Sequence, residues 1–295
     1  MLKSIFFFFL FVVVFFFQGF TKEKSIVTIK GFAPTYVGKT VELFTIEDYF
    51  SRKESLIASS MVLEDSTLNQ LVYNALSFGT AVMLGAFVYF LTQIKSVAKQ
   101  YQSGVAVSAV VVGIAGYHYY RMWSDWGSGT VNEGYRYADW LITVPLLVIE
   151  LLIVLGVTAD RRKKLMTTLV PATVLMIGLG YPGETATSDG TKWTFWILAM
   201  LPFIYILFTL SGELKAAGSR EKGAVASSIK NATTILLLTW LVYPIGYLFP
   251  VIFDAGNDGA ETARQLAYTV ADITAKGLYG LMILNIAKAR SGDSN

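Results

Sequence analysis

The sequence predicts an all-α membrane protein, a bundle of seven membrane-spanning helices with its N-terminus outside and its C-terminus in the cytoplasm. Three observations predict this fold. The 295 residues are 54% hydrophobic and only 15% charged, whereas a soluble domain of this length carries about 25% charged residues. The charges gather between apolar runs of about 20 residues, the length at which a helix crosses a bilayer. Basic residues are also divided unequally between the two sides of those runs.

The first 65 residues differ from the rest. An apolar run from Ile5 to Phe17 follows Lys3 and has the length of a signal-peptide core, so we expect residues 1–19 to be a signal peptide, with an uncleaved anchor as the alternative. Residues 20–65 are expected to form a short β-type extramembrane extension. The runs SIVTIKG, KTVELFTI and SLIASSMVL have strand-like composition and are broken by Gly, Pro and charged residues.

Seven apolar segments follow within residues 66–290, and residues 291–295 form a predicted cytoplasmic tail. The segments lie approximately at 67–93, 104–124, 133–156, 164–184, 193–211, 230–252 and 265–287. The connections on one side hold twelve Lys and Arg residues, counting the C-terminus, whereas the other side holds three, Arg121, Lys192 and Arg264. Positive charge marks the cytoplasmic side, which gives the stated orientation and a multi-pass protein of the cell (inner) membrane.

Composition also excludes several kinds of site. The chain has no cysteine and one histidine, so thiol catalysis, thiolate metal ligands and multi-histidine metal sites are excluded. No Walker, Rossmann or zinc motif is present in the sequence. We therefore expect neither an enzyme, a metal site nor a nucleic-acid partner.

The third segment contains RYADWLITVPLLVIE, which places ionisable groups in an apolar span. Such residues are costly in a membrane and are functional candidates. Asp139 and Thr143 lie one helical turn apart, and Asp139 and Glu150 return to nearly the same face, roughly 16 Å apart along the axis. Arg136 lies one turn further out. Glu150 alone could be a snorkelling end residue, but the shared face favours a function.

The seventh segment contains Asp272 and Lys276, one helical turn apart in apolar surroundings. A structural ion pair is the alternative. However, Lys276 lies near the bilayer midplane, where desolvation favours a neutral, nucleophilic amine that can form a Schiff base with an aldehyde. If that Schiff base is protonated, Asp272 and Asp139 can supply its counterions, and Arg136 can balance the two negative charges.

Aromatic residues accompany these groups in several segments. Each is most often simply packing, but beside a midplane lysine they can wall a slot for a flat, conjugated ligand. The aromatic candidates are Tyr137, Trp140, Trp196, Trp240, Tyr243 and Tyr247. Pro145 and Pro244 are expected to kink their helices beside the slot.

The only histidine, His118, lies in GYHYYRMW near the outer end of the second segment. A structural role is the simpler interpretation. A partner that tunes the carboxylate of Asp139 is the alternative.

These residues resemble the microbial (type 1) rhodopsins. The resemblance rests on RYADWLITVPLLVIE, WLVYPIGY and ADITAKGLYG, and GIAGYHYYRMW is similar to the proteorhodopsin branch. It covers about residues 67–290 and is weaker in the first, fourth and fifth segments. It implies all-trans-retinal bound to Lys276 as a protonated Schiff base, and a light-driven outward proton pump.

The resemblance also implies a role for each site residue. Asp139 would accept the Schiff-base proton, Glu150 would donate its replacement from the cytoplasmic side, and Asp272 would be the second counterion. Thr143 would hydrogen-bond near Asp139, Arg136 would gate the outward path, and His118 would bond to Asp139. The aromatic candidates would line the retinal pocket.

Finer properties are also implied. Leu147 stands where green-absorbing proteorhodopsins carry leucine, so green absorption is expected. Phe195 or Trp196 stands where some relatives carry a glycine that admits a carotenoid antenna, so no antenna is expected. The remaining expected partners are protons, membrane lipid and further copies of the chain in a homo-oligomer.

Three alternatives remain open at this point. A slow-cycling photosensory rhodopsin would signal through a partner, although it would not need a fast donor such as Glu150. A sodium pump of the same fold carries asparagine, aspartate and glutamine where this chain has Asp139, Thr143 and Glu150. A seven-helix transporter or receptor without retinal would gain no visible absorption from added retinal.

Overall fold

The structure is a computed structural model that describes residues 46–126, 131–253 and 258–292. The chain divides into two compact units, Met1–Ser59 and Ser60–Asn295. All regular secondary structure in the described residues is helical. The predicted signal peptide and the first predicted strand lie outside the described residues.

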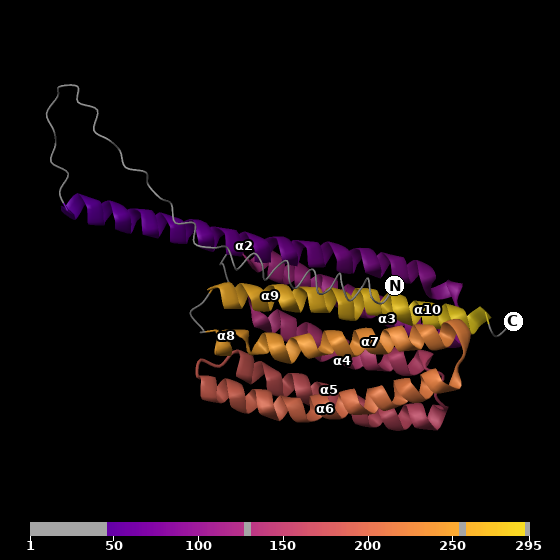
Figure 1. The fold of residues 1–295 in the computed structure, drawn as a ribbon. Helices are drawn as coiled ribbons and strands as arrows, with labels where there is room; N and C mark the ends of the chain where they lie inside the picture. The colour runs from indigo at the N-terminus through magenta and orange to yellow at the C-terminus, as the bar shows by residue number, and fades with distance from the viewer. Residues whose placement is uncertain (1–45, 127–130, 254–257, 293–295) are drawn as a thin grey trace. The chain divides into compact units, whose positions relative to one another are not determined.

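The helices follow one another along the chain with short connections (Figure 1). Their bounds are α2 Ile46–Gln93, η1 Ile94–Ser96, α3 Lys99–Asp125, α4 Glu133–Val154, α5 Ala159–Glu184, α6 Asp189–Arg220, α7 Gly223–Tyr247, α8 Phe249–Ile252, α9 Asp258–Asp272, η3 Ile273–Leu278 and α10 Tyr279–Gly292. The segment η3 is a π-helix, and it joins α9 to α10 in one continuous rod, called here the C-terminal rod.

The prediction of a β-type segment before the bundle is wrong where the structure describes it. Residues 55–63, SLIASSMVL, are helical within α2, and of KTVELFTI only Ile46 is described, as the first residue of that helix. No Gly or Pro occurs between Gly38 and Gly79, so nothing in this stretch interrupts a helix. The helix therefore begins well before the first predicted apolar segment at residue 67.

The described residues form seven long helical rods, as the sequence predicts. Six of them are long and apolar enough to cross a membrane, namely those within α2, α4, α5, α6, α7 and the C-terminal rod. The seventh, α3, carries Tyr, His and Arg side chains in its second half, but it packs on α4 and α10 within the bundle. The bundle is therefore that of a multi-pass membrane protein.

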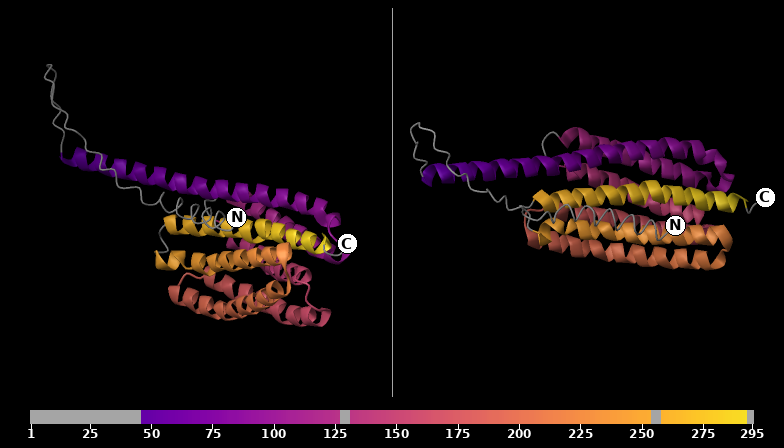
Figure 2. Two further views of the ribbon diagram at one scale, coloured as in Figure 1. Left: turned by 45° about the vertical axis from the view of Figure 1, so that its right-hand side comes forward. Right: turned by 45° about the horizontal axis from the view of Figure 1, so that its top comes forward.

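Six of the seven rods, α3 to α7 and the C-terminal rod, pack in a closed ring, and Figures 1 and 2 show them running alongside one another. Each of α3 to α7 packs on the next, and the C-terminal rod packs on both α7 and α3. Close approach of α2 depends on glycine. A Cβ atom on Gly280 of α10 would lie 2.7 Å from Phe90 Cζ, and one on Gly79 of α2 would lie 2.5 Å from Tyr119 Cδ1. Larger residues at either position would push the helices apart.

Two helices are the most enclosed. In their most apolar windows, 61% of α4 and 67% of the C-terminal rod are buried, against 17% of α6. These are the two elements that carry Asp139, Glu150, Asp272 and Lys276. The charged candidates therefore face the interior of the bundle.

The bundle has two ends that differ in character. The α3–α4, α5–α6 and α7–α9 connections meet at one end, and α4 starts there at Glu133. The half of the bundle toward this end is called the Glu133 half. The α2–α3, α4–α5 and α6–α7 connections meet at the other end, and the half toward it is called the Glu150 half. There Gly156 has a φ of +65°, which L side chains rarely adopt, and it turns the chain from α4 into α5.

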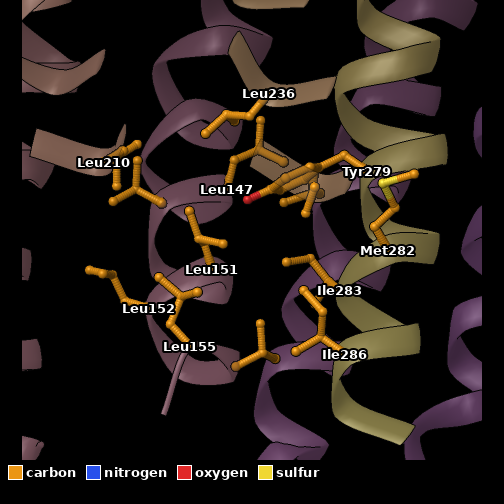
Figure 3. Packing of buried hydrophobic residues seen from close by; sticks show 14 of the residues in the cluster. Leu147, Leu151, Leu152, Leu155, Leu210, Leu236, Tyr279, Met282, Ile283 and Ile286 are labelled. Atoms are coloured by element: carbon orange, nitrogen blue, oxygen red, sulfur yellow. The ribbon is translucent and has the colours of Figure 1, made fainter. Parts of the chain in front are cut away.

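The apolar core lies mainly in the Glu150 half (Figure 3). Leu147 and Leu151 on α4, with Leu155 directly after its end, face Ile283 and Ile286 on α10, and all are at most 2% exposed. Their spacing of three and four residues places each set on one helix face. This side of the bundle is packed with apolar side chains around its few polar groups.

Candidate functional site

Lys276 lies at the centre of the site as a buried amine between two carboxylates. Its Nζ is 3.1 Å from Asp139 Oδ2 on α4, and it also contacts Asp272 Oδ1 one turn earlier on its own rod. All three residues are at most 2% exposed. The structure therefore brings together the lysine and the two carboxylates that the sequence places at similar depth.

The two carboxylates are held differently. Asp272 accepts hydrogen bonds from Tyr119 Oη at 2.9 Å, Trp140 Nε1 at 3.1 Å and Tyr243 Oη at 2.9 Å. Such bonds favour the charged form of a carboxyl group. Asp272 is therefore a fixed negative charge beside Lys276.

Asp139 has far fewer partners. Neither of its carboxylate oxygens has a hydrogen-bond partner among the described residues, so the ion pair with Lys276 is its one short polar contact there. Thr143 donates to the backbone oxygen of Asp139 at 2.8 Å, not to the carboxylate. The charge on Asp139 thus depends on Lys276 remaining charged, which suits a group that takes up a proton when that charge is lost.

Arg136 connects the site to the Glu133 end. It is fully buried, and its Nη1 lies 3.6 Å from Asp272 Oδ2 while its Nε lies 3.4 Å from Glu133 Oε2. Its Nη2 donates to Gln265 Oε1 at 2.7 Å. Its guanidinium also lies over the rings of Tyr119 and Tyr268. Arg136 therefore contacts Asp272 on the side toward Lys276 and Glu133 on the side toward the end of the bundle.

A second polar cluster continues from Arg136 toward the connections. Arg264 donates to Glu184 at 2.7 Å, to Glu261 at 2.8 Å and to Glu133 at 3.3 Å. Glu184 also accepts hydrogen bonds from Tyr268 at 3.0 Å and from Tyr137. We call these six residues, Glu133, Tyr137, Glu184, Glu261, Arg264 and Tyr268, the Arg264 cluster.

A polar cavity adjoins the Arg264 cluster on the outside. Its lining includes Glu184, Lys192, Tyr247, Glu261 and Arg264. Glu184 is therefore reached from the buried network on one side and from this cavity on the other.

An apolar pocket extends from Lys276 between α4, α5, α6 and α7. It holds about 740 Å³ of space free of atoms, including the part open to the outside, and lies in the size range of ligand sites. Its lining comprises Tyr137, Trp140, Val144, Leu147, Met176, Ile177, Gly180, Trp196, Ala199, Met200, Phe203, Trp240, Tyr243, Pro244, Tyr247, Tyr268 and Lys276. All of the aromatic candidates and Leu147 are among them.

The chemistry of this lining fits a long, apolar, conjugated group bound to Lys276. The walls are aromatic and aliphatic, and the polar tips of the ring residues point out of the pocket to partners elsewhere. Tyr247 donates to the backbone oxygen of Lys192 at 2.9 Å, and Trp196 donates to that of Pro244 at 3.0 Å. A Cβ atom on Gly180 would lie 3.1 Å from Tyr137 Oη. The amine is thus the one nucleophile in an apolar lining.

Glu150 lies in the Glu150 half, away from Lys276. It is fully buried, and its Oε2 accepts a hydrogen bond from Ser108 on α3 at 2.7 Å. Its Oε1 has no hydrogen-bond partner among the described residues. No ion pair to Glu150 is found among the described residues either, so a neutral carboxyl group suits this environment.

His118 on α3 contacts the backbone of its own helix. Its Nδ1 lies 3.0 Å from the backbone oxygen of Ile114, and the structure gives no hydrogen bond between His118 and Asp139. The ring is half-buried and packs edge-on against Tyr117. A role of His118 as partner of Asp139 stays a prediction.

Several residues of the site were not identified from the sequence. They include Tyr119, Ser108, Gln265 and the Arg264 cluster apart from Tyr137. One signal could have found some of them, because Arg264, Tyr268, Asp272 and Lys276 follow at steps of four residues and so share one face of the C-terminal rod.

The chain matches one protein family over most of its length. Residues 71–290 match the family described as Bacteriorhodopsin-like protein. The green-light absorbing proteorhodopsin of Gamma-proteobacterium EBAC31A08 is 31% identical over 226 residues, which cover 75% of this chain and 89% of that protein. Archaerhodopsin-2 of Halobacterium sp. (strain aus-2) is 30% identical over 223 residues, covering 71% and 82%.

Solved structures give the same result. The chain is similar to xanthorhodopsin, described as a light-driven ion pump with dual chromophore, with a TM-score of 0.73, 39% identity, and coverage of 77% of this chain and 96% of that one. A thermophilic rhodopsin gives the same TM-score and identity and covers 78% and 97%. The resemblance stated from the sequence is confirmed.

Proposed function

The chain belongs to the bacteriorhodopsin-like family, and from this premise we propose that it is a light-driven pump that exports protons, with all-trans-retinal bound to Lys276. The observation that carries the proposal is the contact of Lys276 Nζ with Asp139 and Asp272 at the end of an apolar, aromatic pocket. Homologues that are light-driven pumps support the class of activity.

Different residues of the chain would hold different parts of the retinal. Lys276 would hold it through Nζ as a protonated Schiff base, and the ring residues of the pocket would clamp its polyene. When bound, the retinal supplies light absorption and an isomerisation that redirects the N–H at Lys276. Trp140 and Tyr243, which both line the pocket and donate to Asp272, would keep the counterion aligned with that nitrogen.

Asp139 accepts the proton in this proposal. In the dark it is ionised and paired with the positive nitrogen of Lys276. When the N–H turns away, the pair loses its mutual stabilisation, and a buried charge without a partner is costly. Because Asp139 has few other partners and Asp272 has several, the proton passes to Asp139.

Glu150 returns a proton to Lys276 from the opposite side. Its apolar surroundings favour the protonated carboxyl group, and its position in the Glu150 half places it across Lys276 from the Arg264 cluster. By the positive-inside rule the Glu150 end is cytoplasmic. Transport is therefore outward because the acceptor and the donor lie on opposite sides of one nitrogen.

The Arg264 cluster offers the exit path. Five carboxyl groups, those of Asp139, Asp272, Glu133, Glu184 and Glu261, contact three cations, those of Lys276, Arg136 and Arg264. Because the carboxyl groups outnumber the cations, the cluster can hold a proton. Arg136 links Asp272 to Glu133, so the loss of the charge on Asp139 changes the field that the cluster experiences, and the cluster can release that proton toward the polar cavity at Glu184.

Finer properties follow from the pocket. Leu147 is an apolar pocket residue beside Lys276, in keeping with green absorption. Trp196 fills the α6 wall and hydrogen-bonds to Pro244, so we propose that no carotenoid antenna binds there.

Illuminated cells test the proposal directly. Cells that express the chain, supplied with all-trans-retinal in weakly buffered medium, are expected to acidify the medium in light, and a protonophore should abolish the change. Asp139→Asn should abolish it as well. Asp189→Asn is the matched control, because Asp189 is an exposed residue at the start of α6, and it should pump normally.

The alternatives give other outcomes. A sodium pump would make the medium more alkaline in light, and a protonophore would increase that change. A photosensor would return to its dark state only over seconds after a flash, and it would move no net protons across the membrane. Acidification that persists in Asp139→Asn would reject the assignment of the acceptor.

A further inference from the structure

The Glu150 half contains a buried hydroxyl group that the pump mechanism above does not use. Tyr279 on α10 is 0% exposed, and its Oη has no hydrogen-bond partner among the described residues. A buried hydroxyl without a partner lowers stability, and phenylalanine at this position would fill the same space without that cost. The hydroxyl therefore calls for an explanation beyond packing.

Tyr279 stands between Lys276 and Glu150. It follows Lys276 by three residues on the C-terminal rod, which is about one helical turn. The next residue, Gly280, approaches α3 so closely that an added Cβ would lie 3.5 Å from Ser108 Cβ. Ser108 is the residue that donates to Glu150. Tyr279 is thus one turn from Lys276 on its rod and directly precedes the glycine that packs on Ser108.

The hydroxyl points into the apolar layer on α4. Figure 3 shows the Tyr279 ring reaching across from α10 with its oxygen toward Leu147. Leu147 lines the pocket at Lys276 and lies three residues before Glu150 on the same helix. The oxygen of Tyr279 is therefore a polar atom within the apolar layer around Leu147.

Glu150 has matching bonding capacity. Its Oε2 is occupied by Ser108, but its Oε1 has no hydrogen-bond partner among the described residues. A tyrosine hydroxyl can donate one hydrogen bond and accept others, so it can bond at once to a carboxyl group on one side and to a nitrogen or a bridging water on the other.

We propose that the Tyr279 hydroxyl is a proton relay from Glu150 to Lys276. Glu150 passes its proton to Tyr279 Oη as the hydroxyl passes its own toward the nitrogen of Lys276, directly or through water. Glu150 becomes a carboxylate, the nitrogen becomes positively charged, and Tyr279 ends unchanged. The relay rests on the proposed pump function and adds to it a residue for the return step.

The first test is kinetic and uses Tyr279→Phe, which removes only the hydroxyl. Flash absorption spectroscopy of the retinal-loaded protein follows the loss of the proton to Asp139 and its later return to Lys276. We expect the return to slow about tenfold and the preceding transfer to Asp139 to keep its rate. Tyr101→Phe is the matched control, because Tyr101 is a buried tyrosine of the same core cluster on α3, and both rates should be unchanged.

The second test needs no light. Thermal unfolding of the full-length protein is measured for Tyr279→Phe, Glu150→Leu and the double variant. If the hydroxyl reaches Glu150 Oε1 in solution, directly or through a bridging water, Tyr279→Phe lowers the melting temperature by about 2–4 °C, and this loss disappears in the Glu150→Leu background. If the hydroxyl only fills space, its removal raises the melting temperature in both backgrounds.

The outcomes separate the relay from the pump. A pumping wild type whose Tyr279→Phe variant returns the proton at the wild-type rate would overturn the relay alone. A melting temperature that rises equally in both backgrounds would overturn it as well. A wild type that moves no protons in light would reject the proposed function, and the relay with it.

Discussion

The two halves of the bundle place their polar groups in opposite ways. In the Glu133 half, Arg136 and the Arg264 cluster form a continuous network from Lys276 to a polar cavity. In the Glu150 half, Glu150 and its partner Ser108 lie in a packed apolar core. A network with several carboxylates can share a proton among them, whereas an isolated carboxyl group must hold and deliver its own. The difference suits release on one side and controlled return on the other.

Removing the group where the two halves meet should have the largest effect. Lys276→Ala leaves no amine for the retinal, removes the cation from Asp139 and leaves Asp272 with Arg136 alone. We expect complete loss of colour after addition of all-trans-retinal and complete loss of light-driven acidification, measured by visible spectroscopy and medium pH. The wild type should lose its colour with hydroxylamine. A Lys276→Ala protein that is coloured and acidifies the medium in light would contradict the role of Lys276 as the attachment site of the retinal.

Removing the isolated donor should be nearly as damaging. Glu150→Gln keeps the shape and the contact with Ser108 but cannot supply a proton, so we expect the return to Lys276 to slow about 100-fold. The proton must then come from solvent, so the return rate should fall about tenfold for each unit rise in pH, whereas the wild type should change little. Flash spectroscopy between pH 6 and 9 measures this. A return rate that is as fast as wild type and independent of pH would remove Glu150 from the path.

The same kind of substitution in the other half should matter much less. Glu184→Gln removes one of three carboxylates bound to Arg264, and Glu133 and Glu261 remain. We expect proton release to the medium to slow only about threefold to tenfold, as loss of one hydrogen-bonded partner predicts, with the return step unaffected. A pH-indicator dye in the medium measures release after a flash. If Glu184→Gln slowed proton release as much as Glu150→Gln slows the return step, the other carboxylates of the Arg264 cluster would not be sharing the release of the proton.

The smallest effect is expected from the partner of Glu150. Ser108→Ala removes one hydrogen bond of 2.7 Å, worth about 1 kcal/mol, from a group that still has Tyr279 nearby. The return step should change about fivefold or less, and the Glu150 carboxyl band in infrared difference spectra should shift. Thr173→Ala on α5 is the control, since its buried hydroxyl bonds only to its own helix. An unshifted band would show that Ser108 does not hold Glu150.

Hydropathy and charge predicted the bundle well, because each span needs its own apolar run. Six of the seven rods meet that requirement, and the shared face of Asp139 and Glu150 favoured an inward position for Glu150. The segment before the bundle was predicted less well. Short runs such as SLIASSMVL have the composition of strands, and only the absence of Gly and Pro over a longer window favours the helix that α2 forms there.

The charged centre was predicted and much of its surroundings was not. Lys276, Asp139 and Asp272 stand at one depth in apolar spans, so the sequence alone suggests that they meet. Glu133 and Glu184 stand at helix ends, where acidic residues are common and exposed, and nothing local indicates that Arg264 gathers them. Contacts of this kind depend on how the helix ends converge, which the order of residues along one helix does not reveal.

The π-helical turn at Ile273–Leu278 has a consequence for changes in chain length. It holds one residue more than the same stretch of α-helix would. The π-helical turn takes up that residue within one turn, so deleting one residue there would restore an ordinary α-helix and leave α10 facing α3 and α4 nearly as before. Deleting one residue from the α-helical stretch that follows would instead turn the rest of α10 by about 100° about its axis and separate its packing face from its neighbours. The rod can therefore tolerate a change of length at Ile273–Leu278 that it cannot tolerate elsewhere.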